Sequence, residues 1–354
     1  MSRYLKEIYQ KLDAYTPGEQ PKDGEYIKLN TNESPFPPAP SVVEKLTSQD
    51  IENLRLYSDP TMSNLREKLG ALYGVDKDNI YLSNGSDDIL NFVFMAFAQN
   101  GAIFPEITYG FYKVFCELHN VEYDEIPLRE DFTVDYKDYI SKNKLIVIAN
   151  PNAPTGDCRP VEEIEKIVSS NPDNVVVIDE AYVDFGGESC YPLTEKYDNL
   201  LVVRTFSKSR SMAGARLGYA IGPKGLISDL EKLKYSTNPY NINRLTGILG
   251  EATVDAEEYY SEKCKEIIRV RTITEEKLRN MGFEVLPSKA NFLFAKSSSI
   301  DGETLYRKLK ERHILVRHFS KDKIKDFNRI TIGTEEQMNK LLDAVREILE
   351  GGSI

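Results

Sequence analysis

The chain has 354 residues, of which 41% are hydrophobic and 29% are charged, and its formal net charge is −11. This composition is typical of a soluble globular protein that can bury the core of one large domain and a smaller one. The negative charge argues against nucleic-acid binding, and no apolar run reaches the roughly 18 residues of a membrane span.

The first residues of the chain lack the apolar core of a signal peptide, so we expect a cytoplasmic protein. The four cysteines are widely scattered and the three histidines show no ligand spacing. We therefore expect reduced thiols and no metal site. Several prolines before residue 40 disfavour a helix, and residues 1–29 are predicted to form an extended arm that is ordered only where it packs on the rest of the chain.

Apolar runs of strand length alternate with helical patterns in the middle of the chain. The expected helices are 41–56, 62–73, 89–98 and 161–169, and the expected strands are 80–82, 102–104, 145–149, 175–178, 201–206 and 218–222. This alternation predicts an α/β domain with a mainly parallel sheet, which we place at residues 30–250.

The C-terminal part of the chain has a different pattern. Helical periodicity covers residues 251–280, and shorter elements follow at 283–286, 292–295, 305–312, 314–318, 329–333 and 335–349. These elements predict a smaller α+β domain over residues 251–354.

One lysine stands out because it follows the apolar strand at 201–206. Lys208 lies between two serines, and Arg216 follows eight positions later. A lysine that forms a Schiff base needs a pocket of low dielectric constant, and serine hydroxyls with an arginine fork bind phosphate. Together they point to a pyridoxal phosphate site. The alternative is an ordinary solvated lysine.

Other polar groups also lie at strand ends, where ligands bind to parallel sheets. The helix start at Ser86 offers free amides that suit a phosphate, or it is a plain capped helix. Asp179 is placed to hold a protonated pyridine nitrogen, or it is a structural acid. Two arginines of the small domain, Arg317 and Arg329, form an anion pocket or face solvent.

With these residues named, the chain resembles the fold-type I pyridoxal phosphate aminotransferases over its whole length, and among them the histidinol-phosphate aminotransferases most. The motifs that carry the resemblance occur in the family's order: Asn32–Pro35, Tyr57, Asn84–Asp87, Thr108–Tyr109, Asn150–Gly156, Asp179–Tyr182, Ser207–Arg210 and Arg216. The resemblance implies a mainly parallel, seven-stranded sheet in the large domain and a homodimer with shared active sites.

The resemblance also implies a role for each site residue. Lys208 would hold the cofactor covalently and then move a proton. Asp179 would pair with the pyridine nitrogen, Tyr182 would hydrogen-bond the phenolic oxygen, and Tyr109 would stack on the ring. The cofactor's phosphate would be bound by Gly85, Ser86, Asp87, Ser207, Arg216 and, from the other subunit, Tyr57. The substrate would be bound by Tyr15, Asn32, Arg317 and Arg329.

One position departs from the family. Relatives usually carry asparagine directly before Pro-Thr-Gly, and that side chain bonds the cofactor's phenolic oxygen, whereas this chain has Ala153 there. We expect either Asn152 or Tyr182 alone to make this contact.

The resemblance implies that the amino group is exchanged between L-histidinol phosphate and 2-oxoglutarate, a step of histidine biosynthesis. The Tyr-x-Pro-Gly motif at 15–18 and the residues 239–243 favour this substrate. An aromatic aminotransferase and a threonine-phosphate decarboxylase remain alternatives on the same fold. A non-catalytic regulator would need a basic DNA-binding extension, which this acidic chain does not show.

Overall fold

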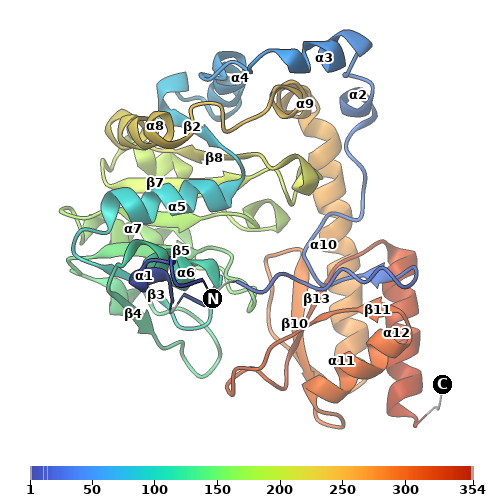
Figure 1. The fold of residues 1–354 in the computed structure, drawn as a ribbon. Coiled ribbons are helices and arrows are strands. Elements are labelled where there is room, and N and C mark those ends of the chain that lie inside the picture. Colours follow the sequence, from blue (N-terminus) through green and yellow to red (C-terminus); the bar gives the residue numbers. More distant parts are fainter. Residues whose placement is uncertain (1, 11, 14, 352–354) are drawn as a thin grey trace.

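A computed structural model describes residues 2–10, 12–13 and 15–351 of the chain. Figure 1 shows a larger part built around a central sheet and a smaller part at the C-terminal end, joined by the long helix α10 (Glu257–Asn280). Among the described residues, no helix combines the length and the apolarity that crossing a membrane requires.

The central sheet has seven strands in the order β2-β8-β7-β6-β5-β3-β4. Its strands are β2 (Ile80–Ser83), β3 (Ala102–Pro105), β4 (Tyr123–Ile126), β5 (Leu145–Ala149), β6 (Val176–Asp179), β7 (Leu200–Thr205) and β8 (Gly218–Ile221). Only β8 runs antiparallel to its neighbours. The predicted α/β fold with a mainly parallel, seven-stranded sheet is confirmed.

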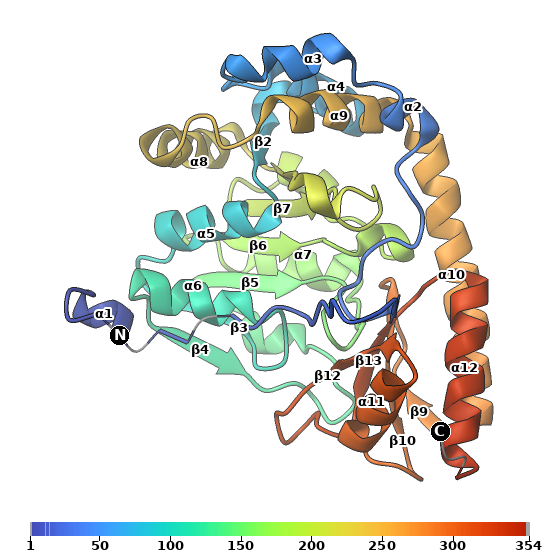
Figure 2. The same ribbon diagram turned by 45° about the vertical axis from the view of Figure 1, so that its right-hand side comes forward.

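Helices cover both faces of this sheet, as Figure 2 shows. They are α4 (Ser63–Tyr73), α5 (Ser86–Phe97), α6 (Phe111–His119), α7 (Val161–Ser169), α8 (Lys224–Thr237) and α9 (Arg244–Asp255). Alternate side chains of a strand point to opposite faces of the sheet: Val147 packs with α5, α6 and α8, whereas Ile146 and Ile148 pack with α7. Burial on both faces explains why β5 is apolar throughout.

The smaller part contains an antiparallel sheet in the order β12-β13-β10-β9. Its strands are β9 (Phe283–Val285), β10 (Phe292–Ser297), β12 (Arg317–His318) and β13 (Asn328–Thr331), and α11 (Gly302–Glu311) and α12 (Glu335–Leu349) accompany them. In the arm, β1 (Ile27–Lys28) pairs with β11 (Ile314–Leu315). The arm is therefore anchored on the smaller part, and the predicted domain boundaries stay predictions.

Several predicted elements are divided in the structure. The helix predicted at 41–56 is two short helices, α2 (Pro40–Val43) and α3 (Ser48–Glu52), because Thr47 forms a capping box that starts α3. The helical pattern at 251–280 spans the end of α9 and the whole of α10. The arm also holds one helical turn, α1 (Glu7–Gln10). Short 3-10 turns occur at 53–55, 77–79, 136–139, 183–185, 191–195 and 213–215.

Candidate active site

The amine of Lys208 lies in the wall of a cavity of about 370 Å³ at the carboxyl end of the central sheet. The Nζ atom donates a hydrogen bond to the Thr31 carbonyl oxygen at 3.1 Å. Burial, together with the charge of Arg329 and against the opposing effect of Glu33, lowers the pKa of Lys208 to about 8. A substantial fraction of this amine is therefore unprotonated, and nucleophilic, near neutral pH.

This pKa leads to a pH prediction. The ligand-free protein should react with a small aldehyde at Lys208 with a rate that rises with pH and has its midpoint near 8, because only the neutral amine attacks. Borohydride trapping followed by peptide mass spectrometry measures the rate at this lysine. Exposed lysines such as Lys224 serve as internal controls in the same sample. A midpoint for Lys208 near the ordinary lysine value of 10.5 would contradict the assignment.

One end of the cavity is suited to an anion. Gly85 precedes α5 with φ 83°, and no side chain caps this helix, whose first residues Ser86 and Asp87 line the cavity, so amides of its first turn are available to an anion. A Cβ on Gly85 would lie 2.6 Å from Arg216 Nη2, so a side chain there would displace the arginine. Arg216 donates to an Asp87 carboxylate oxygen at 3.1 Å, and Ser207 is held by Thr205.

The other end of the cavity carries a buried carboxylate. Asp179 closes β6, and it accepts hydrogen bonds from the Tyr112 hydroxyl at 2.8 Å and from the Ala181 amide at 3.2 Å. Burial raises the pKa of Asp179 to about 6, although these two hydrogen bonds oppose the effect. Among the described residues, no cation forms an ion pair with Asp179. A ligand with a protonated ring nitrogen would supply the missing positive charge.

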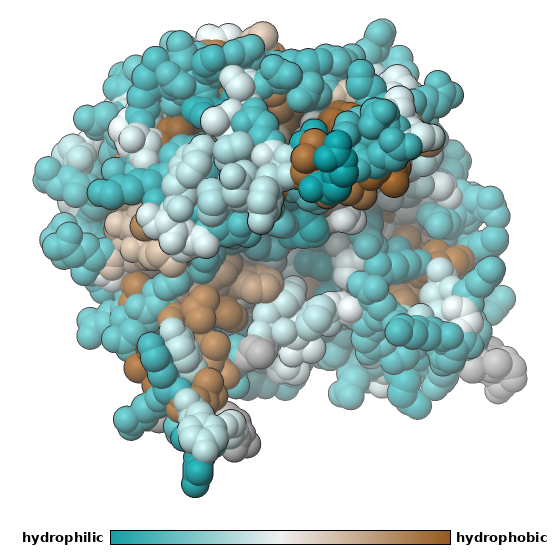
Figure 3. Space-filling model, turned by 45° about the horizontal axis from the view of Figure 1, so that its top comes forward, coloured by the Kyte–Doolittle hydropathy of each residue, from teal (hydrophilic) through white to brown (hydrophobic). Residues whose placement is uncertain are grey.

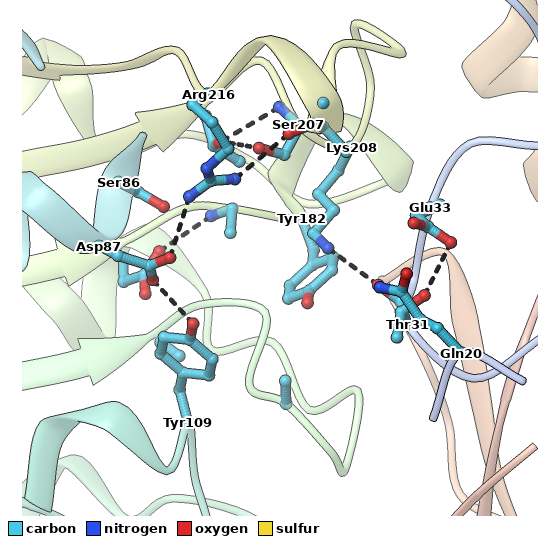
Figure 4. Close-up of a pocket in the computed structure, with 17 residues that line it drawn as sticks. Gln20, Thr31, Glu33, Ser86, Asp87, Tyr109, Tyr182, Ser207, Lys208 and Arg216 are labelled. Carbon is cyan, nitrogen blue, oxygen red and sulfur yellow. Dashed lines mark hydrogen bonds and ion pairs between the residues drawn. The ribbon is translucent and has the colours of Figure 1, made fainter. Parts of the chain in front are cut away.

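Figure 4 shows how these groups converge. Arg216, Ser207, Ser86 and Asp87 lie at one end, Lys208 and Tyr182 lie in the middle, and Thr31, Glu33 and Gln20 approach from the opposite side. Of the residues predicted to hold a cofactor, those lining this cavity are Ser86, Asp87, Tyr109, Asp179, Tyr182, Ser207, Lys208 and Arg216. Tyr109 donates to the Asp87 carboxylate at 2.7 Å.

Asn152 is not brought into the cavity. Its amide nitrogen donates to the Ile107 carbonyl and to the Thr155 hydroxyl, and its oxygen accepts from Thr108, all within 2.9 Å. The side chain is fully buried in these contacts, and it is Ala153 that lines the cavity instead. The arrangement therefore favours the other alternative, in which Tyr182 alone contacts the phenolic oxygen.

A second cavity of about 480 Å³ adjoins the first, and Lys208 and Tyr182 line both. It contains two arginines that form no ion pair among the described residues. Arg329 donates to the Asn30 carbonyl, but its Nε is buried without a hydrogen-bond partner. Arg317 donates to the carbonyl oxygens of Thr16 and Pro17 in the arm. Two guanidinium groups without an ion-pair partner among the described residues give this cavity the chemistry that suits an anion.

The remaining predicted substrate residues also lie at the second cavity. Tyr15 lines it and stacks on Phe111 with ring centroids 4.2 Å apart. Asn32 has a φ of 55° and donates from its amide to the Tyr182 hydroxyl at 3.0 Å. Gln20, which lines both cavities, was not predicted, because a glutamine in an irregular segment carries no sequence signal.

Tyr57 lies outside both cavities of its own chain. Its side chain stacks on Tyr240 with centroids 4.4 Å apart, and Tyr57 is 77% exposed. Tyr112, which holds Asp179, was also missed, since a tyrosine within an apolar helix looks like an ordinary core residue in sequence.

Comparison with known proteins identifies the family. The family model described as aminotransferase class I and II matches residues 24–345. A histidinol-phosphate aminotransferase of Brachyspira hyodysenteriae is 48% identical over 99% of this chain and 100% of its own length.

Two solved structures share the fold. Histidinol-phosphate aminotransferase from Sinorhizobium meliloti in complex with pyridoxal-5'-phosphate has a TM-score of 0.88 at 22% identity, over 100% of this chain and 99% of that one. L-threonine-O-3-phosphate decarboxylase from Porphyromonas gingivalis has a TM-score of 0.81 at 21% identity, over 92% and 99%. The chain therefore belongs to the aminotransferase class I and II family and, within it, to the histidinol-phosphate aminotransferases.

Proposed function

We propose that this protein is a pyridoxal phosphate-dependent transaminase that exchanges the amino group between L-histidinol phosphate and 2-oxoglutarate, as histidine biosynthesis requires. The observation that carries the proposal is the pair of joined cavities. One has the features of a cofactor site around Lys208, and the other presents unpaired arginines to a substrate anion. The match to relatives named histidinol-phosphate aminotransferase, which covers nearly the whole chain, supports the substrate.

The residues present fit pyridoxal phosphate. The free amides at the start of α5, with Ser207 and Arg216, would bind its phosphate, and the unpaired Asp179 would bind its ring nitrogen. Tyr182 would bind the phenolic oxygen, and Tyr109 would contact the ring. When bound, the cofactor supplies an electron sink for the charge that develops at the substrate Cα.

The chain's own groups then position the substrate and move a proton. Arg329 and Arg317 would hold the substrate's phosphate or carboxylate, and forked guanidinium groups accept either anion. With the anion fixed, the substrate's Cα would lie toward Lys208, which lines both cavities. The Nζ of Lys208, with its lowered pKa, would take the proton from Cα as general base and return it later as general acid.

A coupled assay tests the reaction. The purified holoenzyme with L-histidinol phosphate and 2-oxoglutarate should produce glutamate, which glutamate dehydrogenase detects, and no glutamate should form when either substrate is left out. Faster glutamate formation from L-phenylalanine would replace the proposed donor by an aromatic one. Release of carbon dioxide from L-threonine phosphate without glutamate formation would overturn transamination itself.

We also propose a homodimer in which Tyr57 reaches the partner's cofactor phosphate. Several apolar side chains between residues 43 and 57 are at least 47% exposed, including Val43, Ile51, Leu54 and Leu56. Figure 3, which turns the end carrying α2 and α3 forward, shows hydrophobic residues (brown) among the teal ones on this face. A second copy would cover them. The cytoplasmic location predicted from the sequence stays a prediction.

Mixing two impaired variants, Tyr57→Ala and Lys208→Ala, tests the shared site. Tyr57→Ala should weaken cofactor binding by about 10-fold, the size of one lost charge-assisted hydrogen bond. The two variants are then mixed 1:1 and refolded together, so that about half of the dimers are hybrids. If Tyr57 acts across the dimer, each hybrid has one intact site of two, and about a quarter of the wild-type activity returns at limiting cofactor. Activity no higher than the average of the two variants would place Tyr57 in its own subunit's site or outside any site.

A further inference from the structure

Asp184 joins the two chain segments that carry the central residues of the site. It lies in the 3-10 turn Val183–Phe185, two residues after Tyr182 and five after Asp179. It does not line the cavity of Lys208. Neither a motif nor the reaction described above gives this carboxylate a role.

Both carboxylate oxygens of Asp184 bind the segment that carries Lys208. Oδ1 accepts a hydrogen bond from Arg204 Nη2, and Oδ2 accepts one from the Ser209 hydroxyl. Arg204 is the penultimate residue of β7 and precedes Lys208 in the chain, and Ser209 directly follows the lysine. One side chain therefore holds the lysine's segment on both sides of Lys208.

The contact is electrostatic and shielded from water on the arginine side. The side chain of Arg204 is only 6% exposed, its guanidinium lies 5.4 Å from the centre of the Tyr73 ring, and its other carboxylate neighbour, Glu180, is 4.0 Å away. Burial alone raises the pKa of Asp184, but the charges of Arg204 and Arg210, with the hydrogen bonds from Ser209 and Arg204, outweigh it and leave this pKa below its ordinary value. Asp184 is therefore a carboxylate at neutral pH, and Arg204 depends on it for its close counter-charge.

We propose that Asp184 is a positioning residue that fixes the Lys208 amine relative to Asp179 and Tyr182. The three side chains must be aligned on one bound cofactor. Asp179 and Tyr182 lie at or after the end of β6, whereas Lys208 follows β7, so contacts between the two loops fix their relative positions. Asp184 makes two such bonds from one segment to the other. The inference rests on the proposed cofactor site and is independent of which amine is the substrate.

The structure also suggests a conservative variant, Asp184→Glu, that should preserve the positioning of Lys208. A small cavity of about 190 Å³ lies beside Asp184 and is bordered by Ser209 and Arg210. It offers room for the additional methylene group of glutamate. Asp184→Glu keeps the charge and both acceptor oxygens, whereas Asp184→Asn keeps the shape and removes the charge.

The test compares holoenzyme variants in steady-state kinetics and in visible circular dichroism of the bound cofactor, which reports its orientation without any substrate. Asp184→Asn should lower kcat by about 100-fold, the cost of a misplacement of about 1 Å, while KM changes by less than about 3-fold. The dichroic band should weaken, and Asp184→Glu should recover at least about 10-fold in kcat. The matched control is Glu257→Gln, which removes the ion pair of Arg210 on the same loop but leaves both contacts of Asp184 in place.

A second variant keeps the test decisive if Asp184→Asn does not fold. Ser209→Ala leaves the buried ion pair intact and removes one contact, and it should lower kcat by about 10-fold in a protein that still unfolds in one cooperative transition at a slightly lower temperature. Normal kcat and a normal dichroic band in the folded Asp184→Asn, or in Ser209→Ala when Asp184→Asn is unfolded, would overturn the proposal. A wild-type protein that takes up no cofactor would instead overturn the proposed function.

Discussion

Replacing Lys208 by alanine is expected to lower turnover by about 10⁴-fold or more, since the variant lacks both the covalent attachment point and the base that moves the Cα proton. The fold should persist. Burial disfavours the charged form of this amine, and its pKa of about 8 lies below the ordinary value. At pH 7 the folded state therefore bears a cost for protonating Lys208, and alanine removes this cost.

The measurement for Lys208→Ala combines glutamate formation with thermal unfolding of the same preparation. Lys224→Ala is the matched control, because Lys224 is an exposed lysine that pairs with Asp76 and lines neither cavity. Turnover within about 10-fold of wild type in the folded Lys208 variant would contradict the mechanism. An unfolded variant would contradict the view that this lysine serves chemistry and not stability.

Arg329→Lys should produce the second largest effect, a fall in kcat/KM of about 100-fold for both the phosphate and the dicarboxylate substrate. The substitution keeps the positive charge but removes the fork that binds an anion with two parallel hydrogen bonds. The buried Nε of Arg329 has no partner among the described residues, so this nitrogen is available to a ligand. The loss should appear mainly in KM if the anion is held equally before and during the reaction.

Two further arginine variants show whether the effect belongs to this site. Arg317→Lys should cost less, about 10-fold, because Arg317 is more exposed and already donates to the carbonyl groups of Thr16 and Pro17. Arg269→Lys, at an exposed ion pair with Glu335, should leave the kinetics unchanged. Equal kcat/KM values for Arg329→Lys and Arg269→Lys would show that Arg329 does not bind the substrate.

The buried strands could be predicted because burial on both faces demands an apolar run, as at Leu145–Ala149. The edge strand Tyr123–Ile126 could not, since it exposes Asp124 and Glu125 and draws its strand geometry from pairing with β3. The break between α9 and α10 was also invisible, because the helical periodicity continues through Ala256.

In the site, several residues that line the cavity near strand ends could be predicted from their position and from motifs, whereas Gln20 and the residues behind the cavity could not. Lys208 and Asp179 carry a signal because a charged group at or shortly after the end of a buried strand is unusual. Tyr112 donates a tertiary hydrogen bond to Asp179, and Asp184 accepts hydrogen bonds from Arg204 and Ser209 on either side of Lys208; such contacts leave no periodic pattern in the sequence. The sequence also could not show whether Asn152 or Ala153 faces the cavity, because the course of the backbone decides this.

The most direct test is a half-reaction of the coloured holoenzyme with one amine at a time and no keto acid. The account predicts that L-histidinol phosphate removes the absorption band of the lysine-bound cofactor in a saturable way, at far lower concentrations than L-phenylalanine or L-threonine phosphate. Lys208→Ala should show no such conversion under the same conditions. A holoenzyme that prefers L-phenylalanine would contradict the proposed substrate, and a purified protein that binds no pyridoxal phosphate would contradict the account at Lys208 itself.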